Sequence, residues 1–454
     1  MRPNPTATPI RASSDNDPTD RHDRLDRVPV SDALRGVLVA LATGDIDRPV
    51  PWGQITADEL VAALDRERLI GLAHRYVQES PHRDDVPALE AERVREAHLV
   101  TAIRLAVTYQ MMGHVLRHLA KAAPPYLVAK GPAVAQLLYP NPWLRTFSDV
   151  DVIVHQSDWR AMDEVVIGMG FVPERDARVP LPPLTGADAL YERTYRHPSG
   201  FTLDVHYDDL LNCGLAARDA NGFWRRAQQI DIEGVRVRTL APADQFVHLC
   251  AHAHYHGYTR LVWLSDLAFL LRDHGDTVDW DQVVRTVQLE EAQVPVYYTA
   301  RLLEALLGVT VPPRVLAQVR PDRIRRAIHE LLLPERDLVA LRPMWRPDLS
   351  FYFLPLLKRL VPDMLVMGRR RDKLAYLARL LVPPPHWLRR YYSLSPSSPI
   401  WPHYVLHPLK LLYHYATELI TAARLRRLRL DEDDLPYLRR TSVDNGALFP
   451  QSSR

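Results

Sequence analysis

The chain has 454 residues, of which 47% are hydrophobic and 25% are charged, and it carries a formal net charge of +2 at pH 7. This composition is ordinary for a folded globular protein and excludes a chain that is disordered throughout. A net charge so close to zero also excludes a uniformly basic protein that coats nucleic acid. Because one hydrophobic core rarely serves so long a chain, we expect two or three domains.

Residue usage indicates the cellular setting. Arginine outnumbers lysine and proline occurs 38 times, which is typical of a GC-rich bacterial genome. Cys213 and Cys250 form no CxxC pair, so we expect neither a disulfide framework nor a cysteine zinc site. We also find no secretion signal and no run of about 18 apolar residues, so we expect a cytoplasmic protein without a transmembrane segment.

The N-terminal part is predicted to be helical after a disordered tail. Residues 1–28 are polar and lack helical periodicity, so they cannot offset the entropy of ordering. In residues 29–123, apolar residues recur at spacings of three and four, as in ELVAALDRERLIGLAHRYV. This period places apolar side chains on one face of a helix and predicts an N-terminal helical region.

The pattern changes in residues 124–222, which we expect to form an α/β core. YLVAK, SDVDVIV and FTLDVHYD read as strands, and AVAQLLY and WRAMDEVVIGMG read as helices. A helical domain is expected in residues 223–330, an arginine-rich and aromatic-rich helical region in residues 331–440, and a disordered tail in residues 441–454. The predicted fold class is α+β, with a small mixed sheet, N-terminal helices and a helical C-terminal domain.

Three carboxylates are predicted to face the same side of this sheet. Successive side chains of a strand alternate between its faces, so Asp149 and Asp151 point together from SDVDVIV. Either Asp204 or Asp208 could join them from FTLDVHYD, and we expect Asp204 because apolar residues flank it. Oxygen ligands on rigid strands suit Mg²⁺, and two such ions can clamp both oxygens of a phosphoryl displacement.

A phosphate-binding turn is predicted at Lys130 and Gly131, between the strand YLVAK and the helix that follows. A glycine there would let backbone N–H groups approach a phosphate, and a helix N-terminus favours its negative charge. Pro132 removes one backbone donor, and the Lys130 ammonium could compensate for it. An ordinary turn glycine is the alternative interpretation.

The run YLVAKGPAVAQLLYPNPWLRTFSDVDVIV resembles the signature of an uncharacterised bacterial nucleotidyltransferase family within the DNA polymerase β-like superfamily. In that family a Lys-Gly turn, a helix ending in Tyr-Pro, an arginine and a DxD strand follow one another. LDVHYDDL is similar to its Asp-x-His strand, and LAPADQFVHLCAHAHYHGYTRLVWLSDLAFLL is similar to its helical domain. The resemblance extends over about residues 50–430.

The resemblance implies a nucleotidyltransferase that uses Mg²⁺ or Mn²⁺ and takes an NTP such as ATP. Its metal-binding and catalytic residues would be Asp149, Asp151 and Asp204, and its nucleotide-binding residues would be Lys130, Gly131 and Arg145. Arg145 matches the family's arginine and could donate a charge-assisted hydrogen bond to a triphosphate oxygen. A solvated loop arginine is the alternative interpretation.

Three histidines, His248, His252 and His256, lie four residues apart and would share one face of a helix. Histidines along a single helix rarely complete a tetrahedral zinc site, so we expect polar packing near the cleft. Arg260 and Asp266 could orient the same helical region or touch the substrate, and we favour the orienting role.

The C-terminal region mixes cationic and aromatic residues, namely Arg369, Arg370, Arg371, Trp387, Arg389, Arg390, Tyr391 and Tyr392. Such a mixture could contact an anionic lipid surface or nucleic acid. A solvated face along which arginine stems pack is the commoner explanation. Peripheral membrane contact is therefore one expectation, and nucleic acid is not excluded as a partner.

The function expected from these features is metal-dependent transfer of a nucleoside monophosphate from an NTP to an unidentified hydroxyl or phosphate acceptor. One alternative is a toxin-like nucleotidyltransferase that modifies tRNA or protein, which a basic rim beside the cleft would favour. Another is a degenerate nucleotidyltransferase fold that serves as an accessory module of a biosynthetic cluster. The presence of all three carboxylates speaks against degeneracy.

Overall fold

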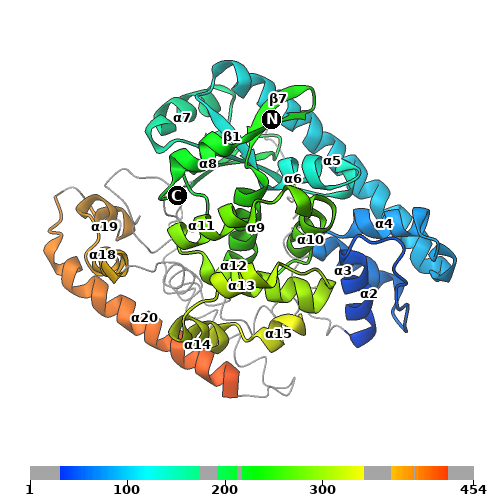
Figure 1. Ribbon diagram of the computed structural model, residues 1–454. Helices are drawn as coiled ribbons and strands as arrows, with labels where there is room; N and C mark the ends of the chain where they lie inside the picture. The colour runs from blue at the N-terminus through cyan, green and yellow to red at the C-terminus, as the bar shows by residue number, and fades with distance from the viewer. Residues whose placement is uncertain are drawn as a thin grey trace, which may run out of the picture.

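The computed structural model describes residues 31–173, 192–211, 217–341, 370–392, 394–395 and 397–427. The predicted tails at residues 1–28 and 441–454 lie outside the described residues, as does Cys213. Figure 1 shows a β-sheet at one end of a larger helical body, with a long C-terminal helix along its edge. The predicted α+β class is confirmed.

The N-terminal helical region contains α2 (Asp32–Ala42), α3 (Ala57–Glu67), α4 (Ile70–Glu79) and α5 (Ala88–Ala122). Local caps explain where α2 and α3 begin. The Ser31 hydroxyl accepts a hydrogen bond from the backbone N–H of Leu34, and Thr56 and Glu59 form a reciprocal capping box. The first turns of α5 pack with α3 and α4, whereas its second half packs on the sheet.

In the described part of the chain, the sheet has seven strands in the order β3-β4-β5-β2-β1-β7-β6. They are β1 (Tyr126–Ala129), β2 (Asp149–Val154), β3 (Val172–Pro173), β4 (Glu192–Arg196), β5 (Thr202–Tyr207), β6 (Gln228–Ile232) and β7 (Val235–Thr239). The pairs β2·β5 and β1·β7 are parallel, and the other neighbours are antiparallel. The strand that carries the DxD pair, β2, is therefore the central strand of a mixed sheet.

Two of these strands correct the predicted domain boundary. The sequence predicts that the core ends at residue 222 and that residues 223–330 are helical. Instead, α8 (Ala220–Arg226) is followed by the hairpin β6–β7, and β7 pairs with β1 inside the sheet, so the core extends to Thr239. The alternation in QQIDI and VRVRT, around a Glu-Gly turn, is a local hairpin signal that the helical prediction for residues 223–330 overlooked.

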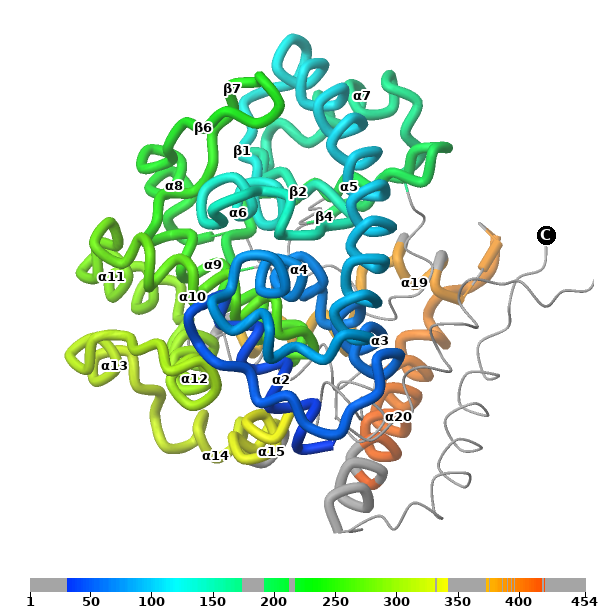
Figure 2. The backbone as a smooth tube through the Cα atoms, turned by 90° about the vertical axis from the view of Figure 1, so that its right-hand side faces the viewer, coloured from blue at the N-terminus to red at the C-terminus, as the bar shows by residue number. Residues whose placement is uncertain are grey.

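One face of the sheet is apolar. Val150 and Val152 on β2 and Leu203 and Val205 on β5 point to this face, where α5 and α7 (Trp159–Gly168) cover them. The opposite face carries the polar residues of the same strands. Figure 2 shows α5 and α8 on opposite sides of the strands. Strand alternation thus leaves one face for packing and one for chemistry.

The helical body contains α9 (Pro242–Tyr255), α10 (Val262–His274), α11 (Trp280–Glu290), α12 (Gln293–Leu302), α13 (Pro313–Gln318), α14 (Arg323–Leu332) and α15 (Glu335–Val339). It is not separate from the N-terminal helical region, because α2, α3 and α4 share one hydrophobic core with α9, α10 and α12. Helix α6 (Lys130–Leu138) enters the same core through Val134, Leu138 and Tyr139. Helices that precede the sheet in the sequence and helices that follow it therefore share one hydrophobic core.

Among the described residues, the helix α5 is long and apolar enough to cross a membrane, judged by length and composition alone. This differs from the expectation that no segment has that character. One helix of this kind is weak support for a membrane span, because the core helix of a soluble protein passes the same test. Leu105, Met112 and Leu116 of α5 pack in the core of the sheet, whereas Leu99 and Ile103 are exposed.

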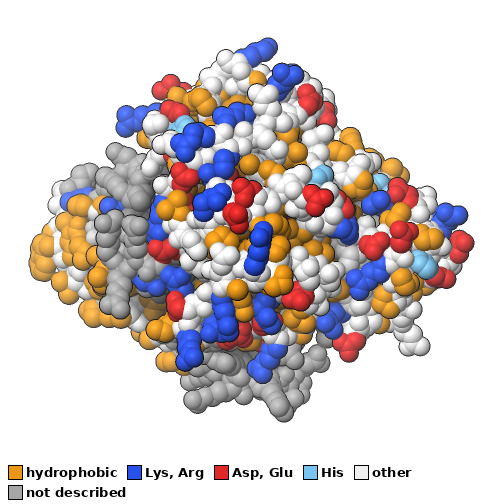
Figure 3. All heavy atoms as spheres, in the orientation of Figure 1, with side chains coloured by type: hydrophobic (Ala, Val, Ile, Leu, Met, Phe, Trp, Pro, Cys, Tyr) orange, Lys and Arg blue, Asp and Glu red, His pale blue; other side chains and the backbone are white. Residues whose placement is uncertain are grey.

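The C-terminal region contains α18 (Arg370–Leu381), α19 (Pro385–Tyr391) and α20 (Trp401–Arg427), and Arg369 lies outside the described residues. Exposed side chains of α20 include Trp401, Val405, Leu409 and Leu412. Figure 3 shows apolar side chains gathered at this edge of the molecule. Contact of this region with a membrane surface stays a prediction.

Candidate active site

The register of β2 and β5 sets the positions of the three predicted carboxylates. Asp151 lies opposite Asp204, and Asp149 lies opposite Thr202. Side chains at paired positions of neighbouring strands share a face, so Asp151 stands between Asp149 on its own strand and Asp204 on the next. All three carboxylates therefore project from the polar face of the sheet.

Asp151 is paired with two basic side chains. Its Oδ1 accepts a hydrogen bond of 2.7 Å from the Lys130 ammonium, and Nε2 of His206 lies 2.9 Å from the same oxygen. Asp151 is only 5% exposed and His206 only 1%. Burial raises the pKa of Asp151, but the Lys130 charge and the bond to His206 outweigh it and hold the pKa below its usual value. Asp151 is therefore ionised at neutral pH.

Asp204 lies in the opposite electrostatic environment. Burial and the charge of Asp151 raise its pKa to about 7, against a hydrogen bond from Thr194, while Glu192 adds to the rise. Its Oδ1 is buried and has no hydrogen-bond partner among the described residues. A buried carboxylate oxygen without a donor is costly unless a proton or a cation meets it.

Asp208 is separate from this group. It follows β5 with a φ of 53°, and its carboxylate accepts hydrogen bonds from the Gln156 backbone at 2.9 Å and from the Trp224 indole at 3.1 Å. Nδ1 of His155 lies 3.1 Å from the same carboxylate. These contacts connect the end of β5 to β2 and α8. The geometry therefore favours Asp204 as the carboxylate beside the DxD pair.

The Lys-Gly turn differs from the expected phosphate cradle. The positive φ falls on Lys130, at 50°, and not on Gly131. Gly131 serves close packing instead, because an added Cβ would lie 2.7 Å from the Cβ of Phe147. The Lys130 side chain contacts Asp151 and lies 3.2 Å from Nε2 of His206. Its ammonium is thus a counter-ion of Asp151, and its binding to an NTP stays a prediction.

Arg145 is buried within the protein. Its Nε and Nη2 each donate a hydrogen bond of 2.8 Å to Asp266, and its Nη1 donates to the Thr146 carbonyl. The Tyr139 hydroxyl donates to the same carboxylate at 2.7 Å. Three of the five guanidinium donors are therefore used inside the protein. This pairing departs from the expected triphosphate contact and agrees with the orienting role favoured for Asp266.

The predicted histidine stripe lies on α9, against the polar face. Nδ1 of His248 lies 2.6 Å from the Leu210 carbonyl, and burial lowers the pKa of His248 to about 3. Burial also holds the pKa of His252 well below its usual value. The rings of His252 and His256 contact each other and Trp263. His248 and His252 are therefore neutral polar residues that add no positive charge to the site.

The oxygen donors at this site fit a divalent ion of the magnesium class. Mg²⁺ binds one or two protein carboxylates together with substrate phosphates. The ionised Asp151 and the unpartnered Oδ1 of Asp204 offer such oxygens on rigid neighbouring strands. Within the described ranges, no three His, Cys, Asp or Glu side chains are gathered closely enough to hold an ion by themselves. A site that substrate phosphates complete agrees with both observations.

Two residues at this site were not assigned a role from the sequence. His206 contacts the Lys130–Asp151 pair, and strand alternation together with the Asp-x-His resemblance could have revealed it. Arg68 donates a hydrogen bond of 3.0 Å to the Ser148 hydroxyl, although 80 residues separate them. No sequence pattern predicts a contact across that separation, so the place of Arg68 beside this site follows only from the tertiary structure.

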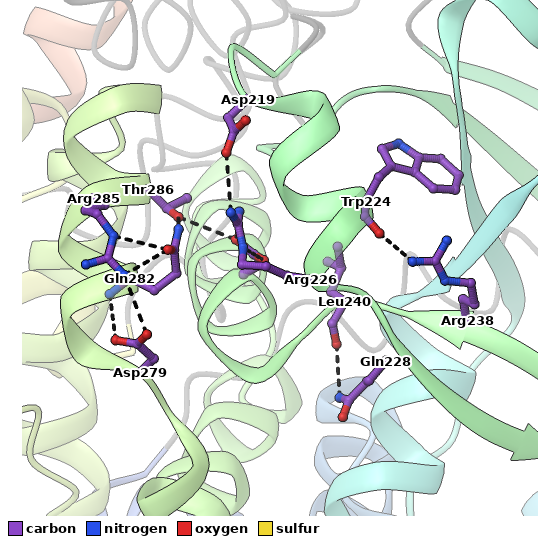
Figure 4. Close-up of polar contacts among 11 residues, drawn as sticks. Asp219, Trp224, Arg226, Gln228, Arg238, Leu240, Asp279, Gln282, Arg285 and Thr286 are labelled. Carbon is purple, nitrogen blue, oxygen red and sulfur yellow. Dashed lines mark hydrogen bonds and ion pairs between the residues drawn. The ribbon is translucent and has the colours of Figure 1, made fainter.

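A cavity of about 170 Å³ is lined by residues of α8 and α11 but by none of the three carboxylates. Its charged lining residues are Asp219, Arg226, Arg285 and Glu290. Figure 4 shows that both arginines are paired within the protein, in the ion pairs Arg226–Asp219 at 3.3 Å and Arg285–Asp279 at 3.5 Å. Glu290 accepts hydrogen bonds from two backbone N–H groups. Balanced charges give no reason to place the chemistry there.

Comparisons with known proteins bear on this site. The family model described as "Uncharacterised nucleotidyltransferase" matches residues 53–308. No curated protein matches the chain. Among solved structures, the chain is similar to the crystal structure of an antigenic nucleotidyltransferase-like protein from Paracoccidioides brasiliensis, with 14% identity and a TM-score of 0.26 over 45% of this chain and 93% of that chain.

The family match alone assigns the chain, because it spans more than half of the sequence. It begins before α3, includes the whole sheet with β2 and β5, and ends after α12. The match thus covers every candidate site residue discussed above. The chain therefore belongs to the uncharacterised nucleotidyltransferase family and is a nucleotidyltransferase.

Proposed function

We propose that the protein transfers a nucleoside monophosphate from an NTP to a hydroxyl or phosphate acceptor, with Mg²⁺ or Mn²⁺ as cofactor. The observation that carries this proposal is the pairing of Asp151 with Asp204 on parallel neighbouring strands, with a buried Asp204 oxygen that lacks a partner. Two carboxylates so close repel each other unless a proton or a cation lies between them, and a divalent ion is the partner that the reaction class needs. The family match supports nucleotidyl transfer as the reaction class.

The residues of the polar face have different roles in the proposed reaction. Asp149, Asp151 and Asp204 would hold the divalent ion, which neutralises charge on the triphosphate when it is bound. His206 orients the Asp151 carboxylate through the contact at 2.9 Å. Lys130 would exchange part of its contact with Asp151 for a phosphate oxygen. Gly131 would support this arrangement by letting α6 pack closely against Phe147.

The reaction forms a bond between the acceptor oxygen and the α-phosphorus of the NTP. It breaks the bond between that phosphorus and the bridging oxygen, whose electron pair leaves with pyrophosphate. The acceptor proton passes to the carboxylate of Asp204. Without a bound ion, burial and the charge of Asp151 raise the pKa of Asp204 to about 7, so its surroundings favour proton binding more than those of an exposed carboxylate.

Transfer of label from NTPs that carry ³²P at the α-phosphate tests this function. The protein is incubated with each NTP, Mg²⁺ or Mn²⁺ and a cell extract, and the small-molecule, nucleic-acid and protein fractions are counted. We expect a labelled small molecule that chromatography separates from the added NTP when the divalent ion is present, and no such product in EDTA. Label in tRNA or protein would favour the toxin-like alternative, and transfer in EDTA would contradict the proposed cofactor.

Two matched variants sharpen the test. Asp204→Asn should abolish transfer but keep much of the NTP affinity, because Asp149 and Asp151 remain. Asp208→Asn changes the same atoms on a residue whose carboxylate is bonded elsewhere, so it should stay active. Normal turnover by Asp204→Asn would remove Asp204 from the site.

A further inference from the structure

A second cluster of charge lies at the Asp149 end of β2, where three arginines come from distant parts of the chain. Arg68 follows α3, Arg145 precedes β2, and Arg260 lies between α9 and α10. Asp149 favours the charged form of each of the three guanidinium groups. The three arginines are therefore near enough to this carboxylate to interact with it electrostatically.

Hydrogen bonds between distant segments place two of these arginines. Arg68 donates to the hydroxyl of Ser148, the residue before Asp149. The residue before Arg68, Glu67, is fully buried and accepts a hydrogen bond of 2.7 Å from the backbone N–H of Leu261. Leu261 directly follows Arg260 in the sequence. The end of α3 is thus joined to β2 and to the start of α10, and it brings Arg68 and Arg260 to the same place.

The arginines differ in how their charges are balanced. Arg145 forms a buried bidentate pair with Asp266. The guanidinium of Arg68 donates to the neutral hydroxyl of Ser148. The guanidinium of Arg260 lies over the Trp263 ring, 5.9 Å from the ring centroid. Over the described ranges, neither Arg68 nor Arg260 forms an ion pair. Arg68 and Arg260 are therefore two partly buried cations without an ion-pair partner among the described residues.

Such a gathering of cations is unfavourable for the fold by itself. Burial and the charges of Arg260 and Arg145 lower the pKa of Arg68 to about 10, although Asp149 and Asp65 oppose this shift. Burial also lowers the pKa of Arg260, although Glu67 and Asp149 oppose it. The planar guanidinium group binds phosphate oxygens with two parallel hydrogen bonds, which makes arginine well suited to polyphosphates. The cluster therefore has the charge and chemistry of a polyphosphate site.

We propose that Arg68 and Arg260 bind the β- and γ-phosphates of the NTP, the part that leaves as pyrophosphate. This inference rests on the proposed nucleotidyl transfer and adds the position of the leaving group. Asp151 separates Asp204 on one side from Asp149 and the arginines on the other. In this proposal the acceptor is deprotonated at Asp204 and the leaving group collects at the arginines beside Asp149, so the two groups have separate positions around Asp151. The N-terminal helical region thereby contributes a binding residue.

Binding of inorganic pyrophosphate and tripolyphosphate to the full chain tests this proposal by calorimetry, with and without Mn²⁺. Arg68→Gln and Arg260→Gln should each weaken binding about tenfold, the loss expected for one charge-assisted contact. Arg285→Gln is the matched control, because it removes the same charge from an exposed position on α11. It should bind like the wild type.

Stability separates ligand binding from a merely structural role. Without an anion, Arg68→Gln and Arg260→Gln should be at least as stable in urea as the wild type, because each removes repulsion between cations. Tripolyphosphate should raise the urea midpoint of the wild type and of Arg285→Gln more than that of either variant. A variant that loses stability without the anion would be structural, and the proposal would fail for that residue.

The outcomes also distinguish this proposal from the proposed function. If the wild type binds pyrophosphate through both arginines but transfers no label from any NTP, nucleotidyl transfer fails and the anion site stands. If transfer proceeds and both variants keep the wild-type KM for NTP, the arginine site fails and the transfer stands. Absence of pyrophosphate binding by the wild type would also overturn the arginine site.

Discussion

The two ends of the polar face of β2 are built in different ways. At the Asp151 end, short contacts with Lys130 and His206 balance the carboxylate. At the Asp149 end, the carboxylate accepts no side-chain hydrogen bond from the described residues, and arginines act on it through longer-range charge. The first end is built within the sheet and its adjacent helix, whereas the second needs segments from three parts of the chain. We infer that the sheet supplies the reacting groups and the helical body supplies substrate binding.

Replacement of Arg145 should have the largest effect, which we expect on the free energy of unfolding. The pair Arg145–Asp266 joins α10 to the segment before β2, so the change tests how the helical body is held at the Asp149 end. Arg145→Ala leaves Asp266 buried without its bidentate partner, and breaking such a pair costs about 3–5 kcal/mol of unfolding free energy. Urea denaturation measures this loss. Arg93→Ala is the control, because the Arg93 ion pairs are exposed and should contribute little. Equal stability of the two variants would contradict the fastening role.

Asp151→Asn should have the next largest effect, on the rate at the Asp151 end. The change removes the charge shared by Lys130 and His206, so the rate of label transfer should fall about 100-fold or more. Initial rates at saturating NTP measure this fall. Asp208→Asn serves as control, and its rate should stay near that of the wild type. A fall of only a few-fold would show that Asp151 is dispensable for the chemistry.

Lys130→Met tests whether the lysine competes with a metal ion at the same end. The Lys130 ammonium contacts the oxygen of Asp151 that would face the ion, so its removal should tighten Mn²⁺ binding about tenfold at pH 8. Electron paramagnetic resonance of free Mn²⁺ measures the affinity. The rate of transfer should nevertheless fall, because a phosphate contact is lost. Unchanged or weaker Mn²⁺ binding would place the ion away from Asp151.

The last prediction concerns the pH dependence of stability due to Asp204. Its pKa is about 7 in the folded protein and about 3.9 in an unfolded chain, so between these values the folded state retains a proton that the unfolded state has released. This stabilisation is fully present below about pH 4 and is lost as the pH rises through 7. The difference between the two pKa values corresponds to an upper limit of about 4 kcal/mol.

Urea midpoints of the metal-free protein between pH 5 and 8 measure this dependence. The difference between the wild type and Asp204→Asn should change steadily across this window, because the amide does not titrate. Mn²⁺ should stabilise the wild type more at pH 8 than at pH 6, since the ion competes with the proton. Parallel curves for the two proteins would mean that Asp204 ionises like an exposed carboxylate.

Much of the sheet could be predicted because its signals are local. The alternation in SDVDVIV and FTLDVHYD predicts β2 and β5 and the shared face of Asp149, Asp151 and Asp204, which the register bears out. The hairpin β6–β7 was missed although its alternation is also local, because the helical period of the residues after it was extended back to residue 223. Arg145 was expected to contact phosphate, since the sequence cannot show that Asp266, 121 residues away, already binds it.

The sequence by itself determined the strands β1, β2 and β5, the side on which each aspartate projects, and the family of the chain. These follow from periodicity and motif order, which depend on residues close together in the sequence. Only the tertiary structure decided that Lys130 contacts Asp151, that Gly131 packs on Phe147, and that α3 brings Arg68 to β2. Such contacts depend on how helices share a hydrophobic core, and burial of apolar surface is non-directional, so no local pattern specifies them.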